Sequence, residues 1–187
     1  MSPVGLVWVA GVSGAGKSSV CEVLKAQGHI AVDTDWEGYS RWVHRVSGEP
    51  VLDPPYPVPP GWLDGFGWKV RPEAVAALAG ELAPGVGFLC GGFENAGEVW
   101  QFFDRVVCLA IDEATLRYRL ANRTTNHFGK HPEELRAALD RSREAEDQYR
   151  SLGATIIDAT QPLEVVVAQV VSSAGGGTQP SPPVDGR

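Results

Sequence analysis

The residues best suited to chemistry form a glycine-rich loop near the start of the chain. Residues 11–18 match the phosphate-binding pattern G-x-x-x-x-G-K-[ST], known as Walker A, at every fixed position. Its glycines allow the backbone to turn successive N–H groups inward, and the positive end of a following helix adds to this cradle for anions. The pattern predicts that a nucleoside triphosphate is bound by Gly11, Val12, Ser13, Gly14, Ala15, Gly16, Lys17 and Ser18.

The sequence on either side gives this loop the context that it needs. The apolar stretch 6–10 before it is short and rich in β-formers. After it, Val20, Val23 and Leu24 recur at helical spacing until Gly28. We therefore expect a strand, the loop and a helix in that order.

Two residues of the loop have expected roles of their own. Lys17 is expected to reach the β- and γ-phosphates, and the hydroxyl of Ser18 is expected to ligate Mg²⁺. The next residue, Ser19, is expected to lie beside the nucleotide as well. The alternative is a glycine-rich turn without a ligand.

Two carboxylates, Asp33 and Asp35, follow the second apolar stretch, residues 29–32. Mg²⁺ takes oxygen ligands and needs only one or two protein carboxylates. Because the third apolar stretch ends without an Asp, Asp33 is the expected second metal ligand. Asp35 is expected to accept a hydrogen bond from a substrate hydroxyl and to act as general base. The alternative is that one of the two only caps a following helix.

Two arginines are candidates for binding the transferred phosphate. Arg119 and Arg123 are four residues apart, so they share one face of a predicted helix. With the polar stretch that follows, they are expected to form a lid over residues 119–132 that brings guanidinium groups to the phosphate. The alternative is an ordinary solvated basic face, which we expect for Arg117. Solvated loop positions, rather than metal ligation, are expected for His127, Lys130 and His131.

Apolar segments alternate with helical patterns along the chain. This alternation predicts an α/β fold, a three-layer sandwich with a five-stranded parallel sheet, whose ligands lie at the carboxyl ends of the strands. Gly91 and Gly92 follow the third strand and are expected near the substrate. Asp112 is the expected N-cap of the helix that carries the arginines. The predicted strands cover residues 6–10, 29–32, 86–90, 105–111 and 155–158.

Residues 36–69 differ in composition and form the expected acceptor-side insert. They contain four of the six tryptophans and six prolines between Pro50 and Pro60. Because proline removes a donor and fixes φ, we expect a helix over residues 36–46 followed by a proline-stiffened loop. Most of the aromatic side chains are expected to pack in this subdomain. The candidates for ligand contact are Trp36, Tyr39 and Trp42, with Arg41 for an acceptor's carboxylate or phosphate.

Composition limits the classes of partner. The chain has 187 residues, which suits a single domain over residues 1–171 and a disordered tail over residues 172–187. The net charge of −7 argues against nucleic acid or an anionic membrane as the main partner. No apolar run is long enough to span a membrane or to form a secretory signal. Buried, reduced cysteines in a cytoplasmic monomer or homodimer are expected at Cys21, Cys90 and Cys108.

These motifs together resemble the nucleotide-kinase-like P-loop phosphotransferases, most closely the shikimate kinase and gluconate kinase branch. The resemblance covers about residues 4–171 and rests on the Walker A loop, on residues 33–35, on the glycines at 91 and 92, and on the arginine helix with its lid. It implies that Asp33 binds Mg²⁺ through water and that Asp35 binds the acceptor hydroxyls. It also implies that Arg123 belongs to the lid and that residues 159–162, with Thr160 and Pro162, flank the adenine.

The sequence departs from shikimate kinases at two places. Those enzymes have three glycines after the third strand, where this chain has Gly91, Gly92 and Phe93. Their arginines for the substrate carboxylate have no clear counterpart here, because the aromatic insert occupies the equivalent region. The tryptophans of the insert suit the stacking of a nucleobase or another flat ring, which is also similar to nucleoside and nucleoside-monophosphate kinases.

The expected function is therefore that of an ATP-dependent phosphotransferase, with ATP and Mg²⁺ as cofactors. It would move the γ-phosphate to a hydroxyl of a small metabolite, with Asp35 as general base. The first alternative is a nucleoside-monophosphate kinase, whose acceptor is a phosphate and needs no general base. The second is a nucleotide-binding regulatory module without a small acceptor.

Overall fold

A five-stranded parallel sheet forms the centre of the molecule. The computed structural model describes residues 5–82, 85–124 and 127–175. Its sheet has the strand order β2-β5-β1-β6-β7, and the strands are β1 (Leu6–Ala10), β2 (Ile30–Asp33), β5 (Gly87–Cys90), β6 (Arg105–Ala110) and β7 (Thr155–Asp158). All neighbouring pairs in it are parallel. The predicted fold and its predicted strands are confirmed, with boundaries that differ by one residue.

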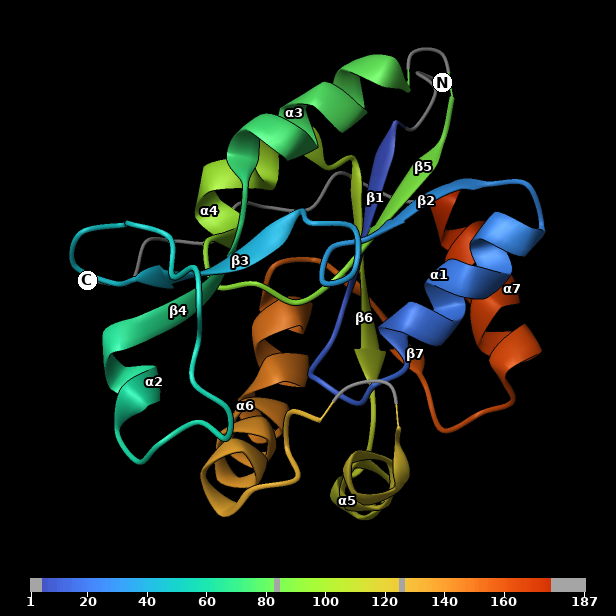
Figure 1. Cartoon of the computed structure of the whole chain (residues 1–187). Helices are drawn as coiled ribbons and strands as arrows, with labels where there is room; N and C mark the ends of the chain where they lie inside the picture. Colours follow the sequence, from blue (N-terminus) through green and yellow to red (C-terminus); the bar gives the residue numbers. More distant parts are fainter. Residues whose placement is uncertain (1–4, 83–84, 125–126, 176–187) are drawn as a thin grey trace.

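Helices cover both faces of this sheet (Figure 1). The side chains of Val7 and Val9 in β1 pack with α1 (Lys17–Ala26) and α7 (Leu163–Ala174). Leu6, Trp8 and Ala10 point to the other face, because successive residues of a strand alternate. This second face is covered by α3 (Pro72–Glu81), α4 (Ala96–Val99), the 3₁₀ turn η1 (Trp100–Phe102) and α6 (Pro132–Ser151).

The helix α5 (Glu113–Asn122) follows β6 and packs against α6 through a small core of its own. Leu116 and Leu120 are fully buried in this core. The expected N-cap is confirmed, since the Asp112 side chain accepts a hydrogen bond of 2.8 Å from the Thr115 amide. Because α5 also lies under the loop that follows β1, it positions that loop.

The insert differs from the prediction. The helix expected over residues 36–46 is absent, and β3 (Ser40–His44) pairs antiparallel there with β4 (Phe66–Val70). The hairpin forms in place of the predicted helix because Trp42 lies opposite Trp68 in the two strands. Aromatic cross-strand pairs of this kind stabilise antiparallel strands. The insert therefore has only one short helix, α2 (Trp62–Gly65), in place of the predicted helical subdomain. Most of residues 50–60 form a loop, as their prolines indicated.

The end of the described chain also differs from the prediction. The last helix, α7, extends to Ala174, three residues past the expected boundary at Val171. Val170 and Ala174 are buried against α1 and β1, so this additional turn has a packing surface. Residues 176–187 of the expected disordered tail lie outside the described part of the chain.

Two expectations from composition were that the cysteines are buried and that no segment spans a membrane. Cys21, Cys90 and Cys108 are all buried free thiols. Burial raises the pKa of Cys108 to about 12, so this thiol stays protonated at neutral pH. Among the described residues, no helix is long and apolar enough to cross a membrane.

Candidate active site

The loop between β1 and α1 has the backbone of an anion cradle. Gly11, Gly14 and Gly16 have φ angles of 143°, 94° and 106°, which L side chains rarely adopt. At Gly14 an added Cβ would also lie 2.9 Å from Leu116 Cδ1 of α5. The sequence therefore needs glycine here both for conformation and for packing, and α1 begins immediately after the loop at Lys17.

Lys17 lies at the centre of the candidate site. Its ammonium group donates a hydrogen bond of 2.8 Å to the Val12 carbonyl. Burial lowers the pKa of Lys17, and the nearby carboxylates of Asp35 and Asp33 oppose this shift. Lys17 is partly exposed at the rim of this anion cradle, so a phosphate bound there would stabilise its ammonium charge.

The two predicted carboxylates differ in their surroundings. Asp33 is buried, and its Oδ1 accepts hydrogen bonds from the amides of Asp35 at 3.0 Å and Trp36 at 3.4 Å. Of the two carboxylates, Asp33 is therefore the one that acts as a cap. It caps a turn, because no helix follows β2 directly. Asp35 Oδ1 accepts from the Trp68 indole N–H at 3.0 Å and from the Thr34 hydroxyl at 3.1 Å.

The arginines of α5 reach the phosphate-binding loop. Arg119 donates to the carbonyls of Ala15 at 3.1 Å and Ala159 at 2.7 Å, so it joins the loop to the segment after β7. Arg123 follows α5 and donates to Ser13 Oγ at 3.1 Å and to the Phe128 carbonyl. Arg117 instead pairs with Glu113 at 2.9 Å on an exposed face, as expected.

Hydrogen bonds with α6 and with Arg123 hold the segment of the expected lid that follows α5. The buried Glu134 of α6 accepts a hydrogen bond of 2.9 Å from the Gly129 amide. His131 precedes α6, and its ring nitrogen lies 3.3 Å from the Tyr56 hydroxyl of the insert loop. Tyr56 also makes an edge contact with His127. The contacts of Arg123, Glu134 and Tyr56 connect this segment to the phosphate-binding loop, to α6 and to the insert.

Two cavities meet at the phosphate-binding loop. The smaller cavity, of about 480 Å³, extends toward α5 and α7, and the larger cavity, of about 860 Å³, lies between the hairpin, the segment after β5 and α6. Most of the predicted nucleotide-binding residues line the smaller cavity, from Ser13 to Ser19 together with Arg119 and Arg123. Four residues line both cavities: Ser13, Lys17, Asp35 and Trp36.

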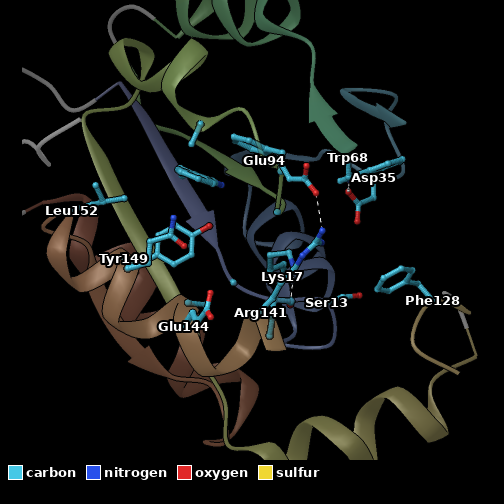
Figure 2. A pocket seen from close by; sticks show the side chains of 18 of the residues that line it. Ser13, Lys17, Asp35, Trp68, Glu94, Phe128, Arg141, Glu144, Tyr149 and Leu152 are labelled. Atoms are coloured by element: carbon cyan, nitrogen blue, oxygen red, sulfur yellow. Dashed lines mark hydrogen bonds and ion pairs between the residues drawn. The ribbon is translucent and has the colours of Figure 1, made fainter. Parts of the chain in front are cut away.

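Helix α6 contributes side chains to the larger cavity that the sequence analysis did not single out. Figure 2 shows Glu144, Tyr149 and Leu152 facing the same space as Lys17, while Arg141 reaches from α6 to Glu94. The sequence does carry a pattern here, because positions 141, 145, 148 and 152 recur at helical spacing on one face. The helix as a whole, however, is rich in charges of both signs, which is equally typical of a solvated helix.

Other predicted residues have different positions. Trp42 and Gly92 line the larger cavity, whereas Tyr39 and Arg41 do not, and Tyr39 packs at the edge of the core beneath the insert. Gly91 is buried, and its carbonyl accepts a hydrogen bond of 2.9 Å from the Trp8 indole. After β7, Ala159, Gln161 and Leu163 line the smaller cavity, while Thr160 and Pro162 lie between them in sequence but not in the lining.

Comparison with known proteins gives matches in structure alone, since no family model and no curated protein matches the sequence. A gluconokinase from Sinorhizobium meliloti 1021 is 22% identical, with a TM-score of 0.52 over 94% of both chains. Shikimate kinase from Acinetobacter baumannii, solved in complex with shikimate, is 16% identical with a TM-score of 0.57 over 91% of this chain and 93% of that one. A sugar kinase from Janibacter sp. HTCC2649 is 17% identical, with a TM-score of 0.53 over 92% of this chain and 95% of that one.

The chain has the fold of a P-loop kinase. At these identities the likeness is one of fold, and it spans nearly the whole chain. In this P-loop kinase fold the loop after β1, the carboxylates after β2 and the glycines after β5 meet at the carboxyl edge of the sheet, as the sequence predicted.

Gly91 gives a direct test of how closely β2 and β5 approach at this edge. An added Cβ would lie 1.9 Å from Thr34 Oγ1, so we expect Gly91→Ala to lower the free energy of unfolding by about 1–3 kcal/mol. Gly80→Ala in α3 is the matched control, because an added Cβ there meets nothing within 4 Å and alanine favours a helix. Urea denaturation measures both, and equal stability of the two variants would contradict this packing.

Proposed function

We propose that the chain is an ATP-dependent kinase that transfers the γ-phosphate to a hydroxyl group of a small molecule. The observation that carries the proposal is the position of Lys17 and Asp35 in the lining of both cavities. The γ-phosphate of a nucleotide bound in the smaller cavity would lie at the loop. An acceptor bound in the larger cavity would then face this phosphate. Phosphoryl transfer asks the protein chiefly for this alignment of two oxygens in line.

In the proposed complex, the ATP phosphates lie in the loop and the nucleoside extends toward α5 and α7. The loop amides and Lys17 bind the phosphates, and Arg119 lies beside them. Tyr118, Asn122 and Gln161 line the same cavity and offer a ring and polar groups to the base and ribose. Thr160 and Pro162 are proposed to flank the adenine at its edge.

The residues present fit the Mg²⁺ that ATP carries. Ser18 offers a hydroxyl oxygen in the lining of the smaller cavity. Asp33 lies in neither cavity lining, so its carboxylate, whose orientation is fixed by two backbone amides, would reach the ion through water. Mg²⁺ prefers such oxygen ligands and keeps several waters, so one hydroxyl and one carboxylate suffice. The ion would neutralise phosphate charge.

Asp35 is the proposed general base. The Trp68 indole and the Thr34 hydroxyl both donate to its Oδ1, which leaves Oδ2 to accept the proton of an acceptor hydroxyl. The acceptor oxygen then forms a bond to the γ-phosphorus as the bond to the β-phosphate oxygen breaks, and ADP leaves. Arg119 and Arg123 would offset the charge on the transferred group, with Arg123 exchanging its bond to Ser13 for one to phosphate.

A hydroxyl acceptor fits the larger cavity better than the phosphate acceptor of a nucleoside-monophosphate kinase. A phosphate needs arginines that are free to bind it. Among the described residues, Arg141 is the only arginine in this lining, and it is paired with Glu94 at 2.7 Å. Arg41, the residue proposed from sequence for this role, lies outside the lining.

A screen of ADP release tests the proposal. Purified protein with ATP and Mg²⁺ is offered nucleosides, nucleoside monophosphates, sugar acids and cyclic polyols, with Lys17→Ala as the blank. We expect at least one hydroxyl compound to raise ADP release above the acceptor-free rate, and this increase to vanish in the blank. Slow ADP release that no compound accelerates would favour the regulatory module instead.

Replacing the proposed base separates chemistry from nucleotide binding. With an acceptor from the screen, Asp35→Asn is expected to lower kcat by about two to four orders of magnitude while the Kd for ATP changes little. Asp53→Asn makes the same chemical change on an exposed loop of the insert and should leave kcat as it is. Stopped-flow nucleotide binding and steady-state kinetics measure the two quantities. Unchanged turnover in Asp35→Asn would remove Asp35 from the mechanism.

Trp68 is proposed to act through Asp35, as a positioning residue. Trp68→Phe keeps a ring in the hairpin but removes the indole donor, so we expect kcat to fall about tenfold with an unchanged KM for ATP. In an Asp35→Asn background the same change should have almost no further effect, because the bond it removes is already altered. Trp62→Phe is the matched control, since Trp62 does not line the larger cavity. Additive effects of the two substitutions would contradict this coupling.

A further inference from the structure

The larger cavity has an unusual balance of charge for a site that would bind an acid. Among its described lining residues the only lysine and arginine are Lys17 and Arg141, whereas three carboxylates, from Asp35, Glu94 and Glu144, face the same space. Lys17 belongs to the phosphate-binding loop. Arg141 is therefore the only lysine or arginine of this described lining that lies apart from that loop.

Arg141 pairs with one of these carboxylates and lies near another in sequence. It reaches from α6 to Glu94 at 2.7 Å, a contact that can be followed in Figure 2, and Glu94 is fixed in turn by Arg45 at 2.5 Å. Glu144 lies three residues after Arg141 on the same helix, and in the described part of the chain it makes no ion pair or hydrogen bond. An anion approaching Arg141 would therefore have to displace Glu94 from the guanidinium and would meet the negative charge of Glu144.

Aromatic rings line the same cavity. Trp42 and Trp68 meet edge-on across the hairpin with ring centroids 5.2 Å apart, and Trp62 contacts Trp42 edge-on at 4.9 Å. Trp36 is 61% exposed and lines both cavities, so a large apolar ring stands open to solvent where they meet. The packed rings of Trp42 and Trp68 offer flat surfaces at little entropic cost, and the faces of aromatic rings attract cations as well as other rings.

At the far end of the cavity, Phe93 stacks on Trp8 with centroids 4.5 Å apart, and Tyr149 contacts Trp8 edge-on. Burial raises the pKa of Tyr149, so its hydroxyl remains a neutral donor. This end therefore adds apolar surface and no positive charge.

From this lining we infer that the acceptor is a flat-ringed hydroxyl compound without a carboxylate or phosphate, and that the cavity discriminates against acidic acceptors. The inference rests on the proposed kinase function and specifies the substrate class of that same site. The tryptophans bind the ring beside Asp35. Glu94 occupies Arg141, and the carboxylates of Asp35 and Glu144, which form no ion pair among the described residues, oppose an acidic group because like charges at close range destabilise a complex.

Matched pairs of compounds test charge separately from shape. The pairs are adenosine and adenosine monophosphate, phenylserinol and phenylserine, and the methyl ester of shikimate and shikimate itself. Isothermal titration calorimetry with Mg²⁺ and a non-hydrolysable ATP analogue measures binding, and ADP release with ATP measures turnover. We expect the member without the acidic group to bind about tenfold more tightly or better in each pair that binds.

Two charge variants identify the source of the discrimination. Glu144→Lys should reduce, about tenfold, the ratio of the Kd of the acidic compound to the Kd of its partner in each pair. Asp147→Lys makes the same change in net charge at an exposed position of α6 outside the cavity lining, and it should leave the ratio unchanged. If both variants shift the ratio equally, the effect is one of overall charge and the inference is overturned.

The outcomes separate this inference from the proposed function. Tighter binding of the acidic members, or no binding by any compound of the panel at millimolar concentration, overturns the inference. Selective binding of the uncharged or cationic members without ADP release from any of them supports the inference and overturns the proposed function. Selective binding with matching selectivity in turnover supports both.

Discussion

The backbone between β1 and α1 turns back on itself where α5 leaves no room for a side chain. At Gly14 an added Cβ would touch Leu116 and Leu120, so the loop rests directly on the fully buried leucines of α5. Arg119 of the same helix then binds the Ala15 carbonyl and the Ala159 carbonyl. One helix thus supports the loop, supplies a cation to it and connects it to the segment after β7. This packing therefore positions Ser13 and Lys17, which line both cavities.

The second half of the candidate site depends on contacts between segments that are distant in sequence. The hairpin places the Trp68 indole on Asp35, which follows β2, and Glu94 after β5 binds Arg45 from the hairpin and Arg141 from α6. These bonds define the larger cavity by joining four parts of the chain. They also pair charges that face the cavity, since Glu94 neutralises Arg141, and this pairing supports the proposed acceptor without an acidic group.

The local patterns of the sequence were sufficient for the sheet and for the phosphate-binding loop. The glycines of the loop, the period of the strands and the Asp112 cap are each encoded within a few neighbouring residues, and the structure confirms them. The hairpin was missed because β3 is stabilised by β4, more than twenty residues later, and no pattern within residues 36–46 reports that partner. The face of α6 was missed because Arg141 and Glu144 look like solvated charges until Glu94 is brought to them. Nonlocal pairing is what a single sequence leaves undetermined.

In the proposed reaction, a phosphate at Lys17 passes from the smaller cavity to a hydroxyl beside Asp35 in the larger one. The most direct measurement follows the label of γ-labelled ATP after incubation with Mg²⁺ and the acceptors of the screen. We expect the label to appear in an organic phosphate ester, and Lys17→Ala to abolish this product. Label recovered only as inorganic phosphate, at the same rate with and without acceptor, would contradict it.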